Sequence, residues 1–243
     1  MGRGPSIEGR KNAADAQKAR IFTKLIREIA MAARSGGVDP AGNPRLRLAI
    51  DRALDANMTK DTIERTLKRV SGAGGAESSM VEIRYEGYGP GGVAIMVDCM
   101  SDNPTRTVAD VRHAFAKHGG HLGTSGSVAY QFKEAGELWF KTVGNAKLEE
   151  RIFEAALEAG AEDVRSEDGY TEVVTPPNAF QAVKKALADA GFTPLQADLV
   201  MRPLNRVAVS GEVAAALSEL LQTLEELEDV QKVVHNADLP EGS

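Results

Sequence analysis

The sequence predicts an α+β protein with an N-terminal three-helix domain followed by two α/β ferredoxin-like domains, the third inserted into the second. Apolar residues recur three and four apart up to Val70, helix-like and strand-like segments alternate afterwards, and one stretch has the order βαββαβ. The 243 residues suit two or three domains, since typical domains hold about 100 to 150 residues. We expect domains at 1–76, at 77–134 joined with 203–243, and at 135–202.

Three amphipathic helices are predicted in the first domain. The first runs from Asn12 to Ala33 around one apolar stripe. Asn43 caps the second helix, with Pro44 at its first position, and Thr59 caps the third. The inward residues of these two helices are predicted to be Leu46, Ala49, Ile50, Ala53, Ile63, Leu67 and Val70.

Charge is strongly segregated along the chain. Up to Val70 there are 15 Lys and Arg against 8 Asp and Glu, whereas the remainder holds 14 against 27. Four basic residues of the first helix fall within about 80° on the side opposite the apolar stripe: Arg20, Lys24, Arg27 and Arg34. The second and third helices add outward Arg45, Arg52, Arg65, Lys68 and Arg69.

Such a face is either a solvated surface or a site for a polyanion. Few acidic residues neighbour the first helix's basic side, whereas a merely solvated face usually mixes both signs. We therefore interpret the nine residues as contacts for nucleic-acid phosphates. Because these side chains point away from the apolar stripe, reversing the charges of Arg20, Lys24 and Arg27 is expected to leave the bundle folded.

Two strands, Met80–Tyr88 and Val93–Cys99, are predicted to follow, joined by a glycine-rich turn. Cys99 shares a face with Val93 and Val97, which indicates a buried core thiol. The turn fits GxGxxG, but a strand follows where a dinucleotide-binding fold needs a helix, and a kinase lysine is missing. Both nucleotide-binding interpretations are excluded.

A helix from Pro104 to His118 leads into a second glycine-rich loop. This loop lacks the lysine of a phosphate-binding loop and lacks GxSxG. His113 and His118 lie about 140° apart around the helix, so neither a metal site nor a cofactor is expected, although His121 is close in sequence. An enzyme using His113, His118 or Ser125 is the least favoured alternative, and no catalytic residue is predicted.

The remaining chain supplies the inserted unit and a tail. The inserted unit is expected as strand 137–143, helix 145–159, strands 162–166 and 170–175, helix 176–190 and strand 193–201. The tail of about forty residues is too short for its own core, so its strand at 206–209, its helix and its strand at 230–235 should complete the sheet that Met80 begins.

Several long motifs in order resemble the YebC family along nearly the whole chain. They are residues 18–34, Asn-Pro-Arg-Leu-Arg at 43–47, Tyr-Glu-Gly-Tyr-Gly-Pro-Gly-Gly at 85–92, Arg-Thr-Val-Ala-Asp-Val-Arg at 106–112 and Gly-Thr-Ser-Gly-Ser-Val at 123–128. That family includes probable bacterial transcriptional regulators and a mitochondrial translational activator of cytochrome c oxidase subunit I. The resemblance implies three domains and a regulatory, non-enzymatic role.

The resemblance leaves two partners open. The leading interpretation is a transcriptional regulator that binds DNA through the basic bundle. The alternative is a translation factor that binds ribosomal RNA and relieves stalled ribosomes. In that case the glycine-rich loops would contribute contacts through Tyr88, Gly89, Pro90, Thr124 and Ser125. No membrane segment is predicted, a cytoplasmic location is expected, and the sequence does not specify an oligomeric state.

Overall fold

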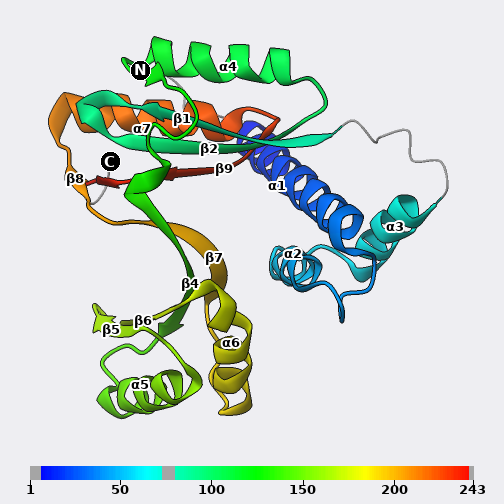
Figure 1. Ribbon diagram of the computed structural model, residues 1–243, viewed down its shortest axis with the longest axis vertical. Coiled ribbons are helices and arrows are strands. Elements are labelled where there is room, and N and C mark those ends of the chain that lie inside the picture. Colours follow the sequence, from blue (N-terminus) through cyan, green and yellow to red (C-terminus); the bar gives the residue numbers. More distant parts are fainter. Residues whose placement is uncertain (1–6, 73–79, 241–243) are drawn as a thin grey trace. The chain divides into compact units, whose positions relative to one another are not determined.

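The computed structural model describes residues 7–72 and 80–240, with side chains from residue 17 onward. Three helices come first, and strands and helices are mixed after them, in agreement with the predicted α+β class (Figure 1). The chain divides into two compact units, each made of separate segments. The first holds the chain up to Arg84 together with residues 97–111 and 222–232, and the second holds residues 85–96, 112–221 and those from Val233 onward.

The first unit contains a bundle of three helices, which confirms the predicted N-terminal fold. These are α1 (Ile7–Gly36), α2 (Pro44–Asp55) and α3 (Lys60–Ser71). Asn43 and Thr59 cap α2 and α3, as predicted, by accepting hydrogen bonds from the backbone amides of Leu46 and Thr62. The buried core of the bundle consists of Ile29, Ala32, Ala33, Leu46, Ala49, Ala53, Met58 and Ile63.

A four-stranded sheet has the order β3-β1-β2-β9. Its strands are β1 (Val81–Tyr88), β2 (Ala94–Ser101), β3 (His121–Leu122) and β9 (Val230–His235). The tail strand β9 lies beside β2, as expected for a tail that completes this sheet. The helices that accompany the sheet in the chain are α4 (Pro104–Lys117) and α7 (Gly211–Glu226).

The second sheet lies wholly in the second unit and has the order β5-β6-β4-β7, antiparallel throughout. Its strands are β4 (Phe132–Lys141), β5 (Asp163–Glu167), β6 (Tyr170–Thr175) and β7 (Gln196–Pro203). Helices α5 (Ala146–Ala159) and α6 (Phe180–Asp189) connect them. This βαββαβ arrangement confirms the ferredoxin-like prediction.

Strand β4 begins at Phe132, five residues before the predicted start at Glu137. It extends because β7 pairs with it along its length, from Phe132 opposite Pro203 to Trp139 opposite Gln196. The first residue of β4 also packs in a cluster with Ala94, Met96 and Val128. The extra length therefore follows from tertiary pairing rather than from local sequence.

Short elements complete the described chain. A two-stranded parallel pair joins β8 (Val207–Ala208) and β10 (Ala237–Asp238), and single 3₁₀ turns occur at Pro90–Gly92, Ala129–Gln131 and Pro177–Ala179. In residues 7–72 and 80–240, no helix combines the length and apolar character needed to cross a bilayer.

Candidate nucleic-acid interface

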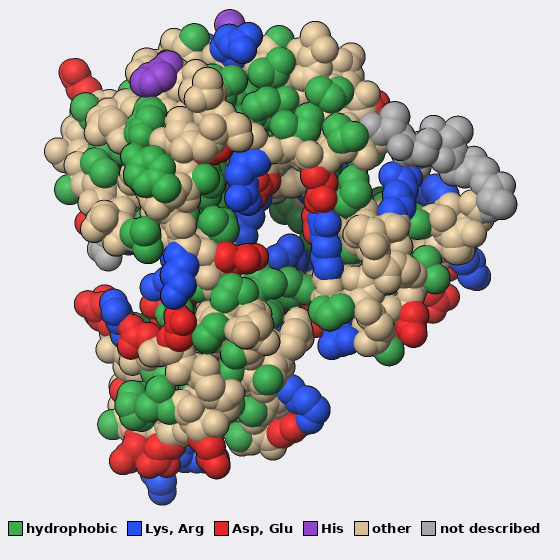
Figure 2. All heavy atoms as spheres, viewed as in Figure 1, with side chains coloured by type: hydrophobic (Ala, Val, Ile, Leu, Met, Phe, Trp, Pro, Cys, Tyr) green, Lys and Arg blue, Asp and Glu red, His purple; other side chains and the backbone are tan. Residues whose placement is uncertain are grey.

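Five of the nine predicted phosphate contacts are exposed on two helices of the bundle: Arg20 and Arg34 on α1, and Arg65, Lys68 and Arg69 on α3. Figure 2 shows Lys and Arg atoms, in blue, over the region labelled α3 in Figure 1, beside acidic atoms in red. One acidic neighbour is Asp61, which pairs with Arg65 one helical turn away. Because an exposed ion pair contributes only about 0 to 1 kcal/mol, a phosphate can compete with Asp61.

The two predicted contacts on α2, Arg45 and Arg52, are partly covered. Arg45 donates through Nε to Glu28 at 3.1 Å and through its terminal nitrogens to Glu82. The hydrogen bonds to Glu82 raise the pKa of Arg45, with Glu28 adding to the shift. Burial lowers the pKa of Arg52, which is half-buried. The outer side of α2 is therefore less available to a polyanion than the sequence predicts.

Lys24 is also held by the fold. Its Nζ donates to the backbone carbonyl of Glu225 at 2.7 Å, near the C-terminal end of α7. A cation is favourable there because the last carbonyls of a helix carry partial negative charge. In return Gln231 donates to the backbone carbonyl of Lys24 at 2.9 Å. Burial lowers the pKa of Lys24, and the Glu225 carboxylate opposes this shift.

Arg27 makes the densest set of contacts in the predicted basic row. Its Nη2 donates to Glu228 Oε1 at 2.9 Å, and its Nη1 lies 3.3 Å from Asp229 Oδ1. The same Nη1 donates to the backbone carbonyls of Glu228 at 3.0 Å and Met100 at 3.4 Å. Only 16% of the Arg27 side chain is exposed. Lys24 and Arg27 are therefore held by contacts within the first unit, to Glu225, Glu228, Asp229 and Met100.

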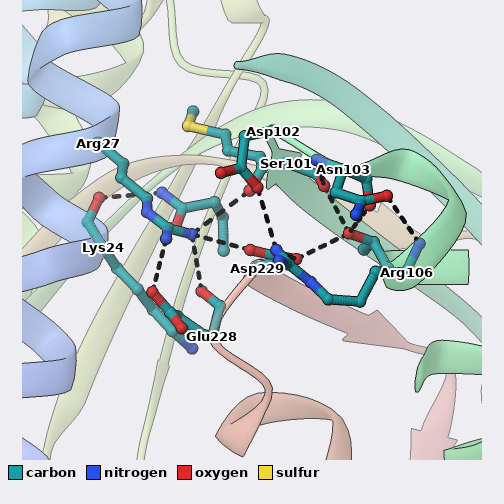
Figure 3. A network of polar contacts seen from close by, with 11 residues as sticks. Lys24, Arg27, Ser101, Asp102, Asn103, Arg106, Glu228 and Asp229 are labelled. Carbon is teal, nitrogen blue, oxygen red and sulfur yellow. Dashed lines mark hydrogen bonds and ion pairs between the residues drawn. The ribbon is translucent and has the colours of Figure 1, made fainter. Parts of the chain in front are cut away.

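Asp229 is the centre of the network drawn in Figure 3. Its Oδ2 accepts from Arg106 Nη2 at 2.9 Å and from Thr107 Oγ1 at 2.7 Å. Thr107 lies 2.5 Å from the hydroxyl of buried Ser101. Burial disfavours the charged form of Asp229, but the hydrogen bonds from Arg106 and Thr107 outweigh burial and lower its pKa. The site is thus a structural junction between α1, the end of β2, the start of α4 and the segment after α7.

Sequence reasoning missed these acidic partners because no spacing rule connects them to α1. Glu228 lies 201 positions along the chain from Arg27, and Asp229 lies 202 positions away. The helical projection predicts which basic residues share one side of α1, but it cannot show what covers them. The acidic run at 225–229 was visible in the sequence, yet it is equally typical of a solvated helix end.

The second glycine-rich loop contacts another buried carboxylate, that of Glu86, which is only 4% exposed. Its oxygens accept from the backbone amides of Gly126 at 2.5 Å, Val128 at 3.0 Å and Ala129 at 2.6 Å. Sequence reasoning did not single out Glu86, although it lies within the Tyr-Glu-Gly-Tyr-Gly-Pro-Gly-Gly motif at 85–92. Three backbone donors converge on this one carboxylate, so Glu86 fixes the shape of the loop that follows β3.

The five predicted loop residues differ in availability. Thr124 and Ser125 are exposed, and Pro90 is half-buried. Tyr88 donates to the carbonyl of Ser127 at 3.1 Å. Gly89 is buried, and a Cβ there would lie 2.8 Å from the Cδ1 of Ile95 and 3.1 Å from that of Leu217. Gly89 therefore permits close packing under α7 and does not present a side-chain surface.

The histidines and the cysteine differ in their surroundings. His113 and His121 are exposed, whereas His118 Nδ1 lies 3.4 Å from Glu219 Oε2. Within the described residues, no three His, Cys, Asp or Glu side chains are placed to hold a metal ion. Cys99 is buried, as predicted, and burial together with Asp98 and Asp229 raises the pKa of its thiol to about 12.

Comparison with known proteins gives a consistent result over almost the whole chain. Residues 4–73 match the model of the TACO1/YebC protein N-terminal domain, and residues 80–237 match that of the TACO1/YebC second and third domain. A probable transcriptional regulatory protein of Xanthomonas campestris is 55% identical over 98% of both chains, and one from Stenotrophomonas maltophilia is 56% identical over 98% of both. The crystal structure of a conserved hypothetical protein from Aquifex aeolicus is 42% identical, with a TM-score of 0.81 over 93% of both chains.

Proposed function

This protein belongs to the TACO1/YebC family, and on that premise we propose that it is a non-enzymatic regulator of transcription that binds DNA through its helical bundle. The names of its relatives in Xanthomonas campestris and Stenotrophomonas maltophilia support the regulatory role. The proposal includes three domains, at 1–76, at 77–134 joined with 203–243, and at 135–202. We propose that the first domain binds the nucleic acid and that the acidic second and third domains do not contact it.

The observation that carries the proposal is the exposed basic set on α1 and α3. Arg20, Arg34, Arg65, Lys68 and Arg69 keep exposed side chains in the folded bundle, whereas Lys24, Arg27, Arg45 and Arg52 are partly covered. Arginine pairs with phosphate through two parallel hydrogen bonds, and each neutralised phosphate releases counterions. The bundle therefore provides a phosphate-binding surface that reads backbone charge. Its only aromatic side chain, Phe22, packs against the core rather than toward a base.

The proposal is tested by reversing three exposed charges on two helices in Arg20→Glu/Lys68→Glu/Arg69→Glu. Binding to random and promoter duplexes is measured by fluorescence anisotropy between about 50 and 200 mM salt. Loss of three phosphate contacts should reduce the slope of log K against log salt by about 2.7, because each contact contributes about 0.9. A tighter constant for promoter than for random duplex is expected of a transcriptional regulator.

The matched control is Lys141→Glu/Lys147→Glu/Lys185→Glu, which changes the net charge equally at exposed residues of the second unit. The control should lower affinity much less, since those residues lie outside the bundle. Equal losses in the two triple variants would contradict the bundle as the binding surface. Equal affinity for every duplex, together with cosedimentation with ribosomes, would replace DNA by ribosomal RNA as the partner.

A further inference from the structure

Two members of the basic row on α1 are occupied by an acidic segment of the same chain. Lys24 and Arg27 follow exposed Arg20 at four and seven positions, so the three lie on one side of the helix. Repulsion from Arg20 and Arg27 adds to the lowering of the Lys24 pKa. Glu225 contacts Lys24 through its backbone carbonyl, and the carboxylates of Glu228 and Asp229 contact Arg27.

We propose that the carboxylates of Glu228 and Asp229 act as an internal substitute for nucleic-acid phosphate. They bind the Arg27 guanidinium in the free protein, and a polyanion displaces them from it. This inference rests on the proposed function of the bundle. The Arg27 guanidinium offers two nitrogens, one to each carboxylate, in the arrangement by which arginine also grips a phosphate. When the contact opens, Arg27 joins the row that Arg20 begins.

Part of the network remains intact when Arg27 leaves, although the backbone carbonyls of Glu228 and Met100 then lose Arg27 as a donor. Asp229 Oδ2 keeps its hydrogen bonds to Arg106 and Thr107 whether or not Arg27 is present. The contact between Asp229 Oδ1 and Arg27 Nη1 is 3.3 Å long, longer than the hydrogen bonds that Asp229 accepts from Arg106 and Thr107. The Glu228 side chain is 78% exposed, so its departure from Arg27 returns a carboxylate to water rather than stranding it in the interior.

Competition of this kind has a measurable consequence. The affinity of the free protein for a polyanion is reduced by the fraction of molecules in which Arg27 is held internally. Removing the exposed competitor should raise that affinity, because Arg27 is then open in a larger fraction of the free molecules.

The test compares Glu228→Gln with Glu226→Gln in the full chain, using a random-sequence duplex as the probe. Each variant removes one exposed negative charge, but only Glu228 pairs with Arg27, whereas Glu226 accepts from Gln222. Glu228→Gln should bind several-fold more tightly than Glu226→Gln. In an Arg27→Gln background, the two substitutions should have equal effects.

Equal affinities of the two single variants would overturn the proposal, as would an advantage of Glu228→Gln that persists in the Arg27→Gln background. These outcomes differ from failure of the proposed function. The proposed function fails if the wild-type chain does not bind duplex, or if the reversal of Arg20, Lys68 and Arg69 leaves its affinity unchanged. Both proposals are then refuted together. Binding through those three residues with no difference between Glu228→Gln and Glu226→Gln refutes the internal substitute alone.

Discussion

Asp229 stays ionised in a buried position because Arg106 and Thr107 direct hydrogen bonds to the same carboxylate oxygen. Its folded-state pKa lies below the ordinary value of 3.8, so its stabilising contribution is complete above that value and is lost as the pH falls through the folded pKa. Asp229→Asn should cost about 1 to 3 kcal/mol at pH 7. Urea denaturation should show this cost shrinking toward zero as the pH falls below the folded pKa.

Asp102→Asn provides the control for this prediction, because Asp102 also pairs with Arg106 but its side chain is 58% exposed. It should change stability by less than about 1 kcal/mol. A cost for Asp229→Asn that stays constant down to acidic pH would contradict the role of its charge.

Cys99 gives a second prediction for a single residue. Burial raises its thiol pKa from 9.0 to about 12, so the thiolate fraction at pH 8 falls by about a thousandfold. Iodoacetamide should therefore modify the native protein far more slowly than the urea-unfolded protein. Equal labelling rates in the native and unfolded states would show that β2 is not closed over this thiol.

Glu86 is predicted to control the loop that follows β3. Glu86→Gln leaves one carbonyl oxygen for three backbone amides, so at least one buried donor loses its acceptor. Amide hydrogen exchange at residues 123–129 should accelerate by about tenfold or more. Exposed Glu134 on β4 supplies the control, since Glu134→Gln should leave that exchange unchanged.

At the scale of elements, the start of α2 depends on one asparagine that does more than cap a helix. Asn43 accepts from the Leu46 amide and donates to the carbonyls of Ala32 and Gly37 at 2.7 and 2.8 Å. Asn43→Ala should destabilise the protein by about 2 to 4 kcal/mol, because the cap is lost and a buried carbonyl loses its donor. Thr59→Ala removes only an exposed cap of α3 and should cost about 1 kcal/mol in the same urea experiment. Equal costs would contradict the bridging role of Asn43.

The sequence predicts helices and caps well because those signals are local. Asn43, Pro44 and Thr59 mark the starts of α2 and α3 within a few residues of chain. The early start of β4 at Phe132 and the two-residue strand β3 depend on partners far along the chain, namely β7 and β1. Turn-rich local sequence at 119–127 gives no sign of that pairing.

The candidate site shows the same limit. Projection of α1 predicts which residues share its basic side, and exposure of Arg20 and Arg34 agrees with that projection. It cannot predict that Glu228 and Asp229 cover Arg27, because their approach is a product of the tertiary fold. Likewise the loop motif at 123–128 was visible, but the buried acceptor that shapes it was not.

At the scale of the whole molecule, charge segregation between the first 70 residues and the rest has two roles in this account. It creates a basic bundle for a polyanion, and it supplies acidic side chains that bind part of that bundle from within the chain. The network around Asp229 joins these roles, since it fixes α1 while leaving Arg20 and the basic residues of α3 exposed.

The most direct measurement is crosslinking of the full chain to nucleic acid in cells, with mass spectrometry locating the crosslinked peptides and sequencing identifying the bound polymer. We predict crosslinks on α1 and α3, and DNA as the polymer. Crosslinks confined to residues 80–240, with none on the bundle, would contradict the central claim.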